Sequence, residues 1–127
     1  ASPTIRDADV ANSADGAYTP TVAATTGTLT TTTVNHAYFR KIGDMAYVEF
    51  DITIDNKGTG AGQLTVSLPE ASAAAATHVL AGREDVVSGD MLQGIIEPAS
   101  SLIKITTYDD QFPSNTGEIL LSGWYRT

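Results

Sequence analysis

The chain contains no cysteine, so neither disulfide bonds nor thiolate-bound metals contribute to its fold. Positive charge is also scarce: seven Lys and Arg residues stand against fifteen Asp and Glu residues, which gives a net charge of −8. This balance argues against a nucleic-acid backbone or an anionic membrane surface as the partner. No uncharged apolar run approaches the ~20 residues that span a bilayer, so membrane insertion is not expected.

Charged residues that favour surface helices are few as well, since only 17% of the residues are charged. Small and hydroxyl-bearing residues take their place, with 18 threonines, 17 alanines, 11 glycines and 9 serines. Short β-branched runs separated by glycine, asparagine and aspartate are typical of antiparallel strands. A length of 127 residues fits one domain, and the composition predicts that this domain is all-β.

The strongest local signal is a long alternation of apolar and polar residues in Met45–Asp55. Such a period of two predicts a strand with one buried face and one mixed polar face. Tyr38–Ile42 before it is predicted to be a second strand, and Gly43-Asp44 between them is a tight-turn signal. The two segments therefore predict a β-hairpin.

Similar patterns predict about nine strands, spaced by roughly ten residues, which favours an antiparallel β-sandwich or jelly roll. Residues Ala1–Ala17 show neither strand nor helix periodicity and are expected to form an arm or linker, with the β-domain at 18–127. The expected strands are Tyr18–Val22, Thr28–Val34, Tyr38–Ile42, Met45–Asp55, Leu64–Leu68, Thr77–Arg83, Asp90–Glu97, Leu102–Thr107 and Gly117–Arg126.

Motifs for catalysis, cofactors or metals give no positive signal. The glycine run at 57–62 leads into a strand pattern, whereas a phosphate-binding loop needs a following helix. His36 and His78 lie far apart in the sequence and lack zinc-ligand spacing. Glu49, Asp51 and Asp55 share one strand face and are interpreted as a solvated acidic stripe rather than as a hydrolytic pair. We therefore expect no enzyme activity, no cofactor and no metal.

The segment between Tyr108 and Asn115 is the best candidate for ligand binding. It offers aromatic faces for the C–H surface of a sugar ring, and carboxylate and amide groups for the hydroxyls. One alternative is a calcium site made by Asp109, Asp110 and loop carbonyls; another is that the aromatic residues only hold the loop on the domain. The candidate ligand residues are Tyr108, Asp109, Asp110, Gln111, Phe112 and Asn115, with Trp124 as an additional candidate.

Several short motifs, taken in order and spacing, resemble a module near the C-terminal end of bacteriophage tail fibres and related tail appendages. These motifs are Tyr18–Thr21, Tyr38–Phe50, Lys57–Gly60, Leu64–Pro69, Gly82–Glu84 and Leu121–Tyr125. Proteins of this kind are usually trimeric β-structures on the virion, and their distal domains adhere to host surface polysaccharide. The resemblance therefore implies a virion or extracellular location, a homotrimer, and a bacterial surface polysaccharide as the partner.

The first hypothesis is thus a non-catalytic adhesion module that binds a host glycan weakly per subunit and gains avidity from threefold display. Two alternatives stay open. In the first, the chain is a structural trimerising or capsid-decorating domain without a ligand. In the second, it is a carbohydrate-binding module of a secreted enzyme.

Overall fold

The computed structural model describes residues 14–127, which form nine β-strands and no helix. The expected all-β fold with about nine strands is confirmed. None of these residues belongs to a helix that is long and apolar enough to cross a membrane. The strands are β1 (Ala14–Ala17), β2 (Val22–Thr26), β3 (Thr31–Ile42), β4 (Met45–Asn56), β5 (Ala61–Ser67), β6 (His78–Glu84), β7 (Met91–Ile96), β8 (Leu102–Thr107) and β9 (Gly117–Arg126).

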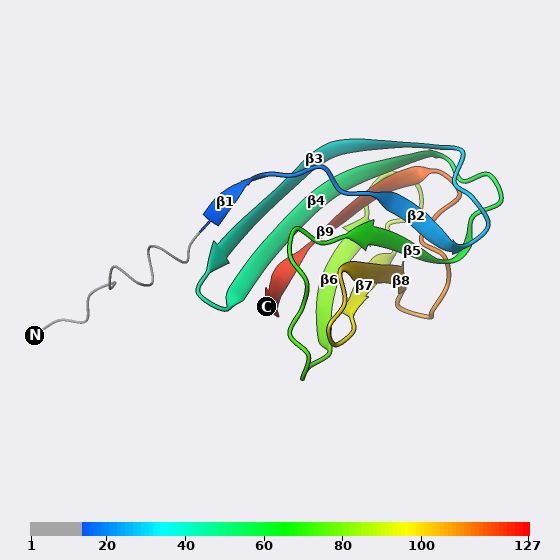
Figure 1. Cartoon of the computed structure of the whole chain (residues 1–127). Helices are drawn as coiled ribbons and strands as arrows, with labels where there is room; N and C mark the ends of the chain where they lie inside the picture. The colour runs from blue at the N-terminus through cyan, green and yellow to red at the C-terminus, as the bar shows by residue number, and fades with distance from the viewer. Residues whose placement is uncertain (1–13) are drawn as a thin grey trace, which may run out of the picture.

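The nine strands of the described part belong to a single sheet in the order β1-β3-β4-β9-β6-β7-β8-β5-β2. All neighbouring pairs are antiparallel. The sheet curls strongly, so that it resembles half of a barrel (Figure 1). The expected sandwich or jelly roll is not confirmed, because a sandwich requires two sheets packed face to face and here one sheet folds over itself.

The predicted hairpin is present as β3 and β4, but β3 is longer than expected. It begins at Thr31 and joins most of the expected strand Thr28–Val34 to the expected strand Tyr38–Ile42 in one strand. A bulge at Asn35 explains the difference. Val34 lies opposite Ile52 and His36 lies opposite Asp51, so Asn35 is an extra residue without a partner position on β4. The extra residue breaks the alternation along the sequence while the strand itself continues.

The expected strand at Tyr18–Val22 is instead a link between the two edges of the sheet. β1, which lies in the segment expected to be an arm, pairs with the end of β3, and β2 pairs with β5. Between them, the Tyr18 amide donates to the Ala37 carbonyl, and the Ser67 amide donates to the Thr21 carbonyl. Four residues therefore bridge from one edge strand to the other. The rest of the expected arm, residues 1–13, lies outside the described residues.

The hydrophobic core fills the concave side of this curled sheet. On β4 every second residue from Ala46 to Ile54 is buried, as the alternation predicts. These side chains meet apolar residues of β5 and β8, which the curvature brings opposite. Tyr125 is buried in the same core and donates its hydroxyl to the Glu70 carbonyl at 2.7 Å. Burial raises the pKa of Tyr125 to about 12.

Small residues on the concave side allow close packing near the centre of the sheet. Gly82 on β6 lies opposite Leu121 of β9. A Cβ at Gly82 would lie 2.1 Å from the Leu120 carbonyl oxygen and 2.9 Å from the Leu121 Cα. Both are backbone atoms of the neighbouring strand, so no side-chain rotation relieves the overlap.

We predict that Gly82→Ala lowers the free energy of unfolding by roughly 1–3 kcal/mol, the usual cost of overpacking. Urea denaturation measures the loss. The matched control is Gly43→Asn, at a turn position with φ of 60° and no atom within 4 Å of the added Cβ. Asparagine tolerates this left-handed conformation, so the control should stay close to wild type. Equal stability of Gly82→Ala and wild type would contradict the packing argument.

Candidate functional site

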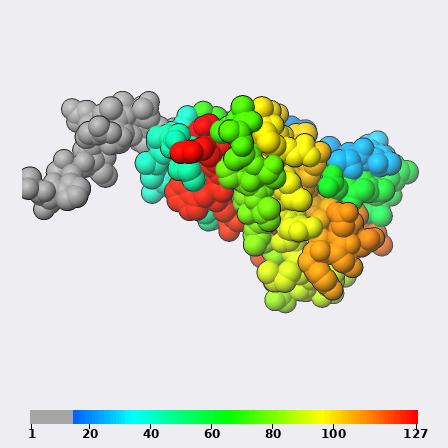
Figure 2. Space-filling view, turned by 90° about the horizontal axis from the view of Figure 1, so that it is seen from below, coloured from blue at the N-terminus to red at the C-terminus, as the bar shows by residue number. Residues whose placement is uncertain are grey.

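Two loops lie together at the end of the sheet that is far from β1. One is the 85–90 loop between β6 and β7, and the other is the 108–116 loop between β8 and β9. Figure 2 shows them side by side, in yellow-green and orange. β1 pairs with β3 next to the turn that joins β3 to β4, which is the opposite end.

The 108–116 loop carries the candidate residues that the sequence indicated. Tyr108 is its most prominent side chain, with 72% of its surface exposed. Asp109, Asp110, Gln111 and Asn115 are exposed as well.

The backbone of this loop is held by Thr107 at its base. The Thr107 amide donates to the Gln111 carbonyl at 2.8 Å, and the Gln111 amide donates back to the Thr107 hydroxyl at 3.1 Å. These bonds close a tight turn in which Asp110 has a φ of 67°. The polar groups of the turn are thus presented in a defined conformation.

Phe112 has a different place from Tyr108. It is half-buried and packs against the hydrophobic core, and the Lys57 ammonium lies 5.3 Å from the centre of its ring. The next residue, Pro113, is buried. Phe112 therefore holds the loop on the domain, which was the alternative that the sequence left open for both aromatic residues. The ring of Tyr108, in contrast, remains open to solvent.

The calcium alternative gains no support from the loop. The Asp109 carboxylate accepts a hydrogen bond from the Thr107 hydroxyl. Calcium takes six to eight oxygen ligands, usually with several carboxylates. Within residues 14–127 no group of three or more His, Asp or Glu side chains is arranged to hold a metal ion.

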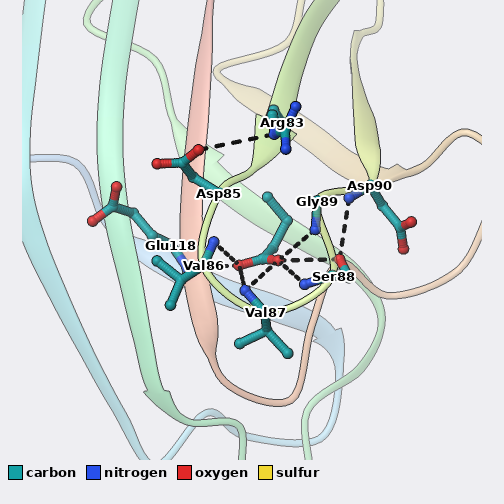
Figure 3. A network of polar contacts seen from close by, with 9 residues as sticks. Arg83, Asp85, Val86, Val87, Ser88, Gly89, Asp90 and Glu118 are labelled. Atoms are coloured by element: carbon teal, nitrogen blue, oxygen red, sulfur yellow. Dashed lines mark hydrogen bonds and ion pairs between the residues drawn. The ribbon is translucent and has the colours of Figure 1, made fainter.

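The neighbouring 85–90 loop is organised by a buried carboxylate that the sequence analysis did not single out. Glu84, fully buried at the end of β6, accepts hydrogen bonds from the backbone amides of Val86 (2.8 Å) and Val87 (2.9 Å). The amide and hydroxyl of Ser88 also donate to it (Figure 3). The chain thus wraps around one side chain and holds Val86 and Val87 outward. One sequence signal could have indicated this arrangement: Glu84 stands at the end of a strand and is followed by a Ser-Gly turn.

The hydrogen bonds determine the ionisation of Glu84. Burial raises the pKa of this carboxyl, but the donors from Ser88, Val87 and Val86 favour the charged form more strongly and lower the pKa to about 2. Glu84 is therefore ionised under all ordinary conditions and serves as a structural anion.

Trp124 is distant from these loops. It lies seven residues along β9 from Gly117, which corresponds to roughly 23 Å at the rise of an extended strand. Its ring packs against Tyr47 of β4 with 5.3 Å between ring centres, and 48% of its surface is exposed. The structure therefore separates Trp124 from the other candidate residues and pairs it with an aromatic residue that the sequence analysis did not name as a ligand.

A shallow groove of about 650 Å³ lies beside this aromatic pair on the convex face of the sheet. Outward side chains of β3, β4, β9, β6 and β7 line it. On its β4 side the Glu49 carboxylate accepts a hydrogen bond from the Tyr47 hydroxyl at 3.2 Å and lies 3.2 Å from the His36 ring nitrogen Nε2. Its lining includes His36, Glu49, Asp51, Arg83, Leu120 and Ser122. The acidic stripe read from the sequence is thus one wall of a groove.

Comparison with known proteins relates the fold to a phage protein. No known protein family matches the chain, and no curated protein matches it. Among solved structures, the crystal structure of the Dettilon tailspike protein (gp208) is similar, with a TM-score of 0.64 and 15% sequence identity. The match covers 90% of this chain but 24% of the tailspike chain, so this chain corresponds to about a quarter of that protein. At this identity the likeness concerns the fold.

We predict that Glu84→Gln lowers the free energy of unfolding at pH 7 by roughly 1–3 kcal/mol, because the amide leaves some of the loop's donors without an acceptor. In the wild type this stabilisation is fully present above pH ~4.5 and is lost as the pH falls towards 2. The variant should lack that part of the pH dependence. Urea denaturation between pH 7 and pH 2 measures both effects.

The control for this variant is Asp85→Asn, which neutralises an exposed carboxylate of the same loop. It should leave stability at pH 7 nearly unchanged, because exposed ion pairs contribute little. A Glu84→Gln protein whose stability falls with acid in parallel with the wild type would contradict the assignment.

Proposed function

We propose that the chain is an adhesion module of a bacteriophage tail appendage. The structural likeness to a tailspike over nine tenths of the chain supports this role, as does the resemblance of its motifs to tail-fibre modules. The location that follows is the virion tail, outside the bacterial cell.

The proposed ligand is a bacterial surface polysaccharide, and the observation that carries this proposal is the exposure of Tyr108 on a fixed turn. Its ring offers a flat face for sugar C–H groups, and Asp110, Gln111 and Asn115 beside it offer acceptors and donors for hydroxyls. Because the loop lies at the end of the sheet opposite β1, it would point towards the host surface.

The module binds without catalysis in this proposal. Glu49 and Asp51 lie on one strand face, about 7 Å apart, which is compatible with glycoside hydrolysis. Each of them, however, has a protein partner: Glu49 accepts from Tyr47, and Asp51 accepts from Asn35 at 3.1 Å.

Three copies of the module are proposed to act together. A weak site on each subunit gains avidity when three sites are displayed on one axis. Threefold assembly follows from the resemblance to tail-fibre modules, and the acidic surface keeps the assembly soluble without favouring binding to polyanions.

We predict that Tyr108→Ala strongly weakens binding to a host glycan array or to host cells, because it removes the stacking face of the 108–116 loop. Tyr108→Phe is the matched control: it keeps the ring, so binding should persist. Since Tyr108 is exposed, both variants should unfold at the wild-type temperature. Unchanged binding by Tyr108→Ala would remove this loop from the site.

Sedimentation equilibrium at micromolar concentration should give about three times the chain mass of 13.3 kDa. A monomer that still binds sugar would instead favour a carbohydrate-binding module of a secreted enzyme. A trimer that binds no host glycan would favour a structural role.

A further inference from the structure

We propose that the groove on the convex face is a second saccharide-binding site, and that it takes a glycan segment without negative charge. This inference rests on the proposed function but places binding at residues other than the 108–116 loop.

The shape of the groove follows from the strand register. Glu49, Ser122 and Ala81 form one row across β4, β9 and β6. Ser122 and Ala81 have short side chains, so the middle of this row is low. The longer side chains of Leu120 and Arg83 form the next row and rise beside it. The hollow therefore runs across the strands, and an extended glycan segment could lie along it.

An aromatic pair lies next to the groove, just beyond its lining residues. Tyr47 and Trp124 are the next outward residues after Glu49 and Ser122 on the same two strands, and they lie directly opposite each other. Their ring centres lie 5.3 Å apart with planes tilted by 51°, and Trp124 remains 48% exposed. Aromatic faces beside a few polar groups are the usual make-up of a small-ligand site.

The polar groups of the groove are held in place before any ligand arrives. Tyr47 donates to Glu49, and Asn35 donates to Asp51. Each carboxylate retains free lone pairs, because a carboxylate accepts about four hydrogen bonds. Arg83 approaches Asp85 only to 3.8 Å and has five N–H donors. Fixed acceptors on one side and donors on the other suit the hydroxyls of a sugar.

The charge of the site selects among glycans. The carboxylates of Glu49 and Asp51 outnumber the permanent cation of Arg83, and Glu118 lies beyond Asp51 on the same face. Partial desolvation and the nearby carboxylates of Asp51, Asp85 and Glu84 raise the pKa of Glu118, which reflects a negative local potential. Uronic acids, sialic acids and phosphates are therefore repelled, whereas neutral and amino sugars are accepted.

The test uses oligosaccharides released from the host surface polysaccharide and separated into neutral or amino-bearing and acidic fractions. Binding to the full chain is measured by calorimetry. The groove variants are Trp124→Ala, which removes one ring of the aromatic pair, and Ala81→Trp, which fills the hollow from an exposed strand position. The control is Leu102→Ala, which removes an exposed apolar side chain of β8 outside the groove. Thermal unfolding verifies that each variant is folded.

We expect the neutral or amino-bearing fraction to bind the wild type, and both groove variants to weaken this binding at least tenfold, while Leu102→Ala binds like the wild type. Groove variants that bind like the wild type while Tyr108→Ala loses binding would overturn the second site and leave the proposed function standing. A preference for the acidic fraction would overturn the ligand class. A wild type that binds neither fraction would overturn the site and the proposed function together.

Discussion

A single sheet with one apolar face has to bury that face, and in this protein the sheet does so by curling over itself. Ile52 and Ile119 at the centre of the sheet belong to the same core as Val66 and Ile103 from the strands near one edge, and all four are completely buried. Hydrophobic burial is the main force that favours folding. Because residues 14–127 provide no second layer, the curvature is the means by which the core closes. The short link at residues 18–21, which joins the two edge strands, maintains this shape.

In this arrangement the two faces and the ends of the sheet have different roles. The concave face is occupied by packing, so polar and aromatic groups that remain accessible lie on the convex face or in the end loops. Loops that project from the end of a sheet need internal support, and the buried carboxylate of Glu84 gives it to the 85–90 loop. In the neighbouring loop, Thr107 and Phe112 have the same role. Both loops therefore expose Tyr108, Val86 and Val87 on rigid supports.

The candidate site was only partly predictable. Residues of a contiguous loop can be grouped from the sequence, and Tyr108 to Gln111 and Asn115 do lie exposed in one loop. The sequence could not distinguish Tyr108, which is exposed, from Phe112, which packs on the core, because both are aromatic and four positions apart. It also could not show that Trp124 meets Tyr47, or that Glu49 and Arg83 line one groove. Those residues come from strands far apart in the sequence, and only the register across β4, β9 and β6 brings them together.

The sequence by itself determined the class of the fold and most of its strands, because side-chain alternation is a local property that each strand expresses alone. The burial of every second residue from Ala46 to Ile54 follows directly from that pattern. The tertiary structure decided that there is one curled sheet rather than two, since the order of strands depends on pairing between distant segments. It also decided that β3 runs through the bulge at Asn35, and that Glu84 is buried as an anion. These outcomes depend on hydrogen bonds and packing between residues that only the folded chain places side by side.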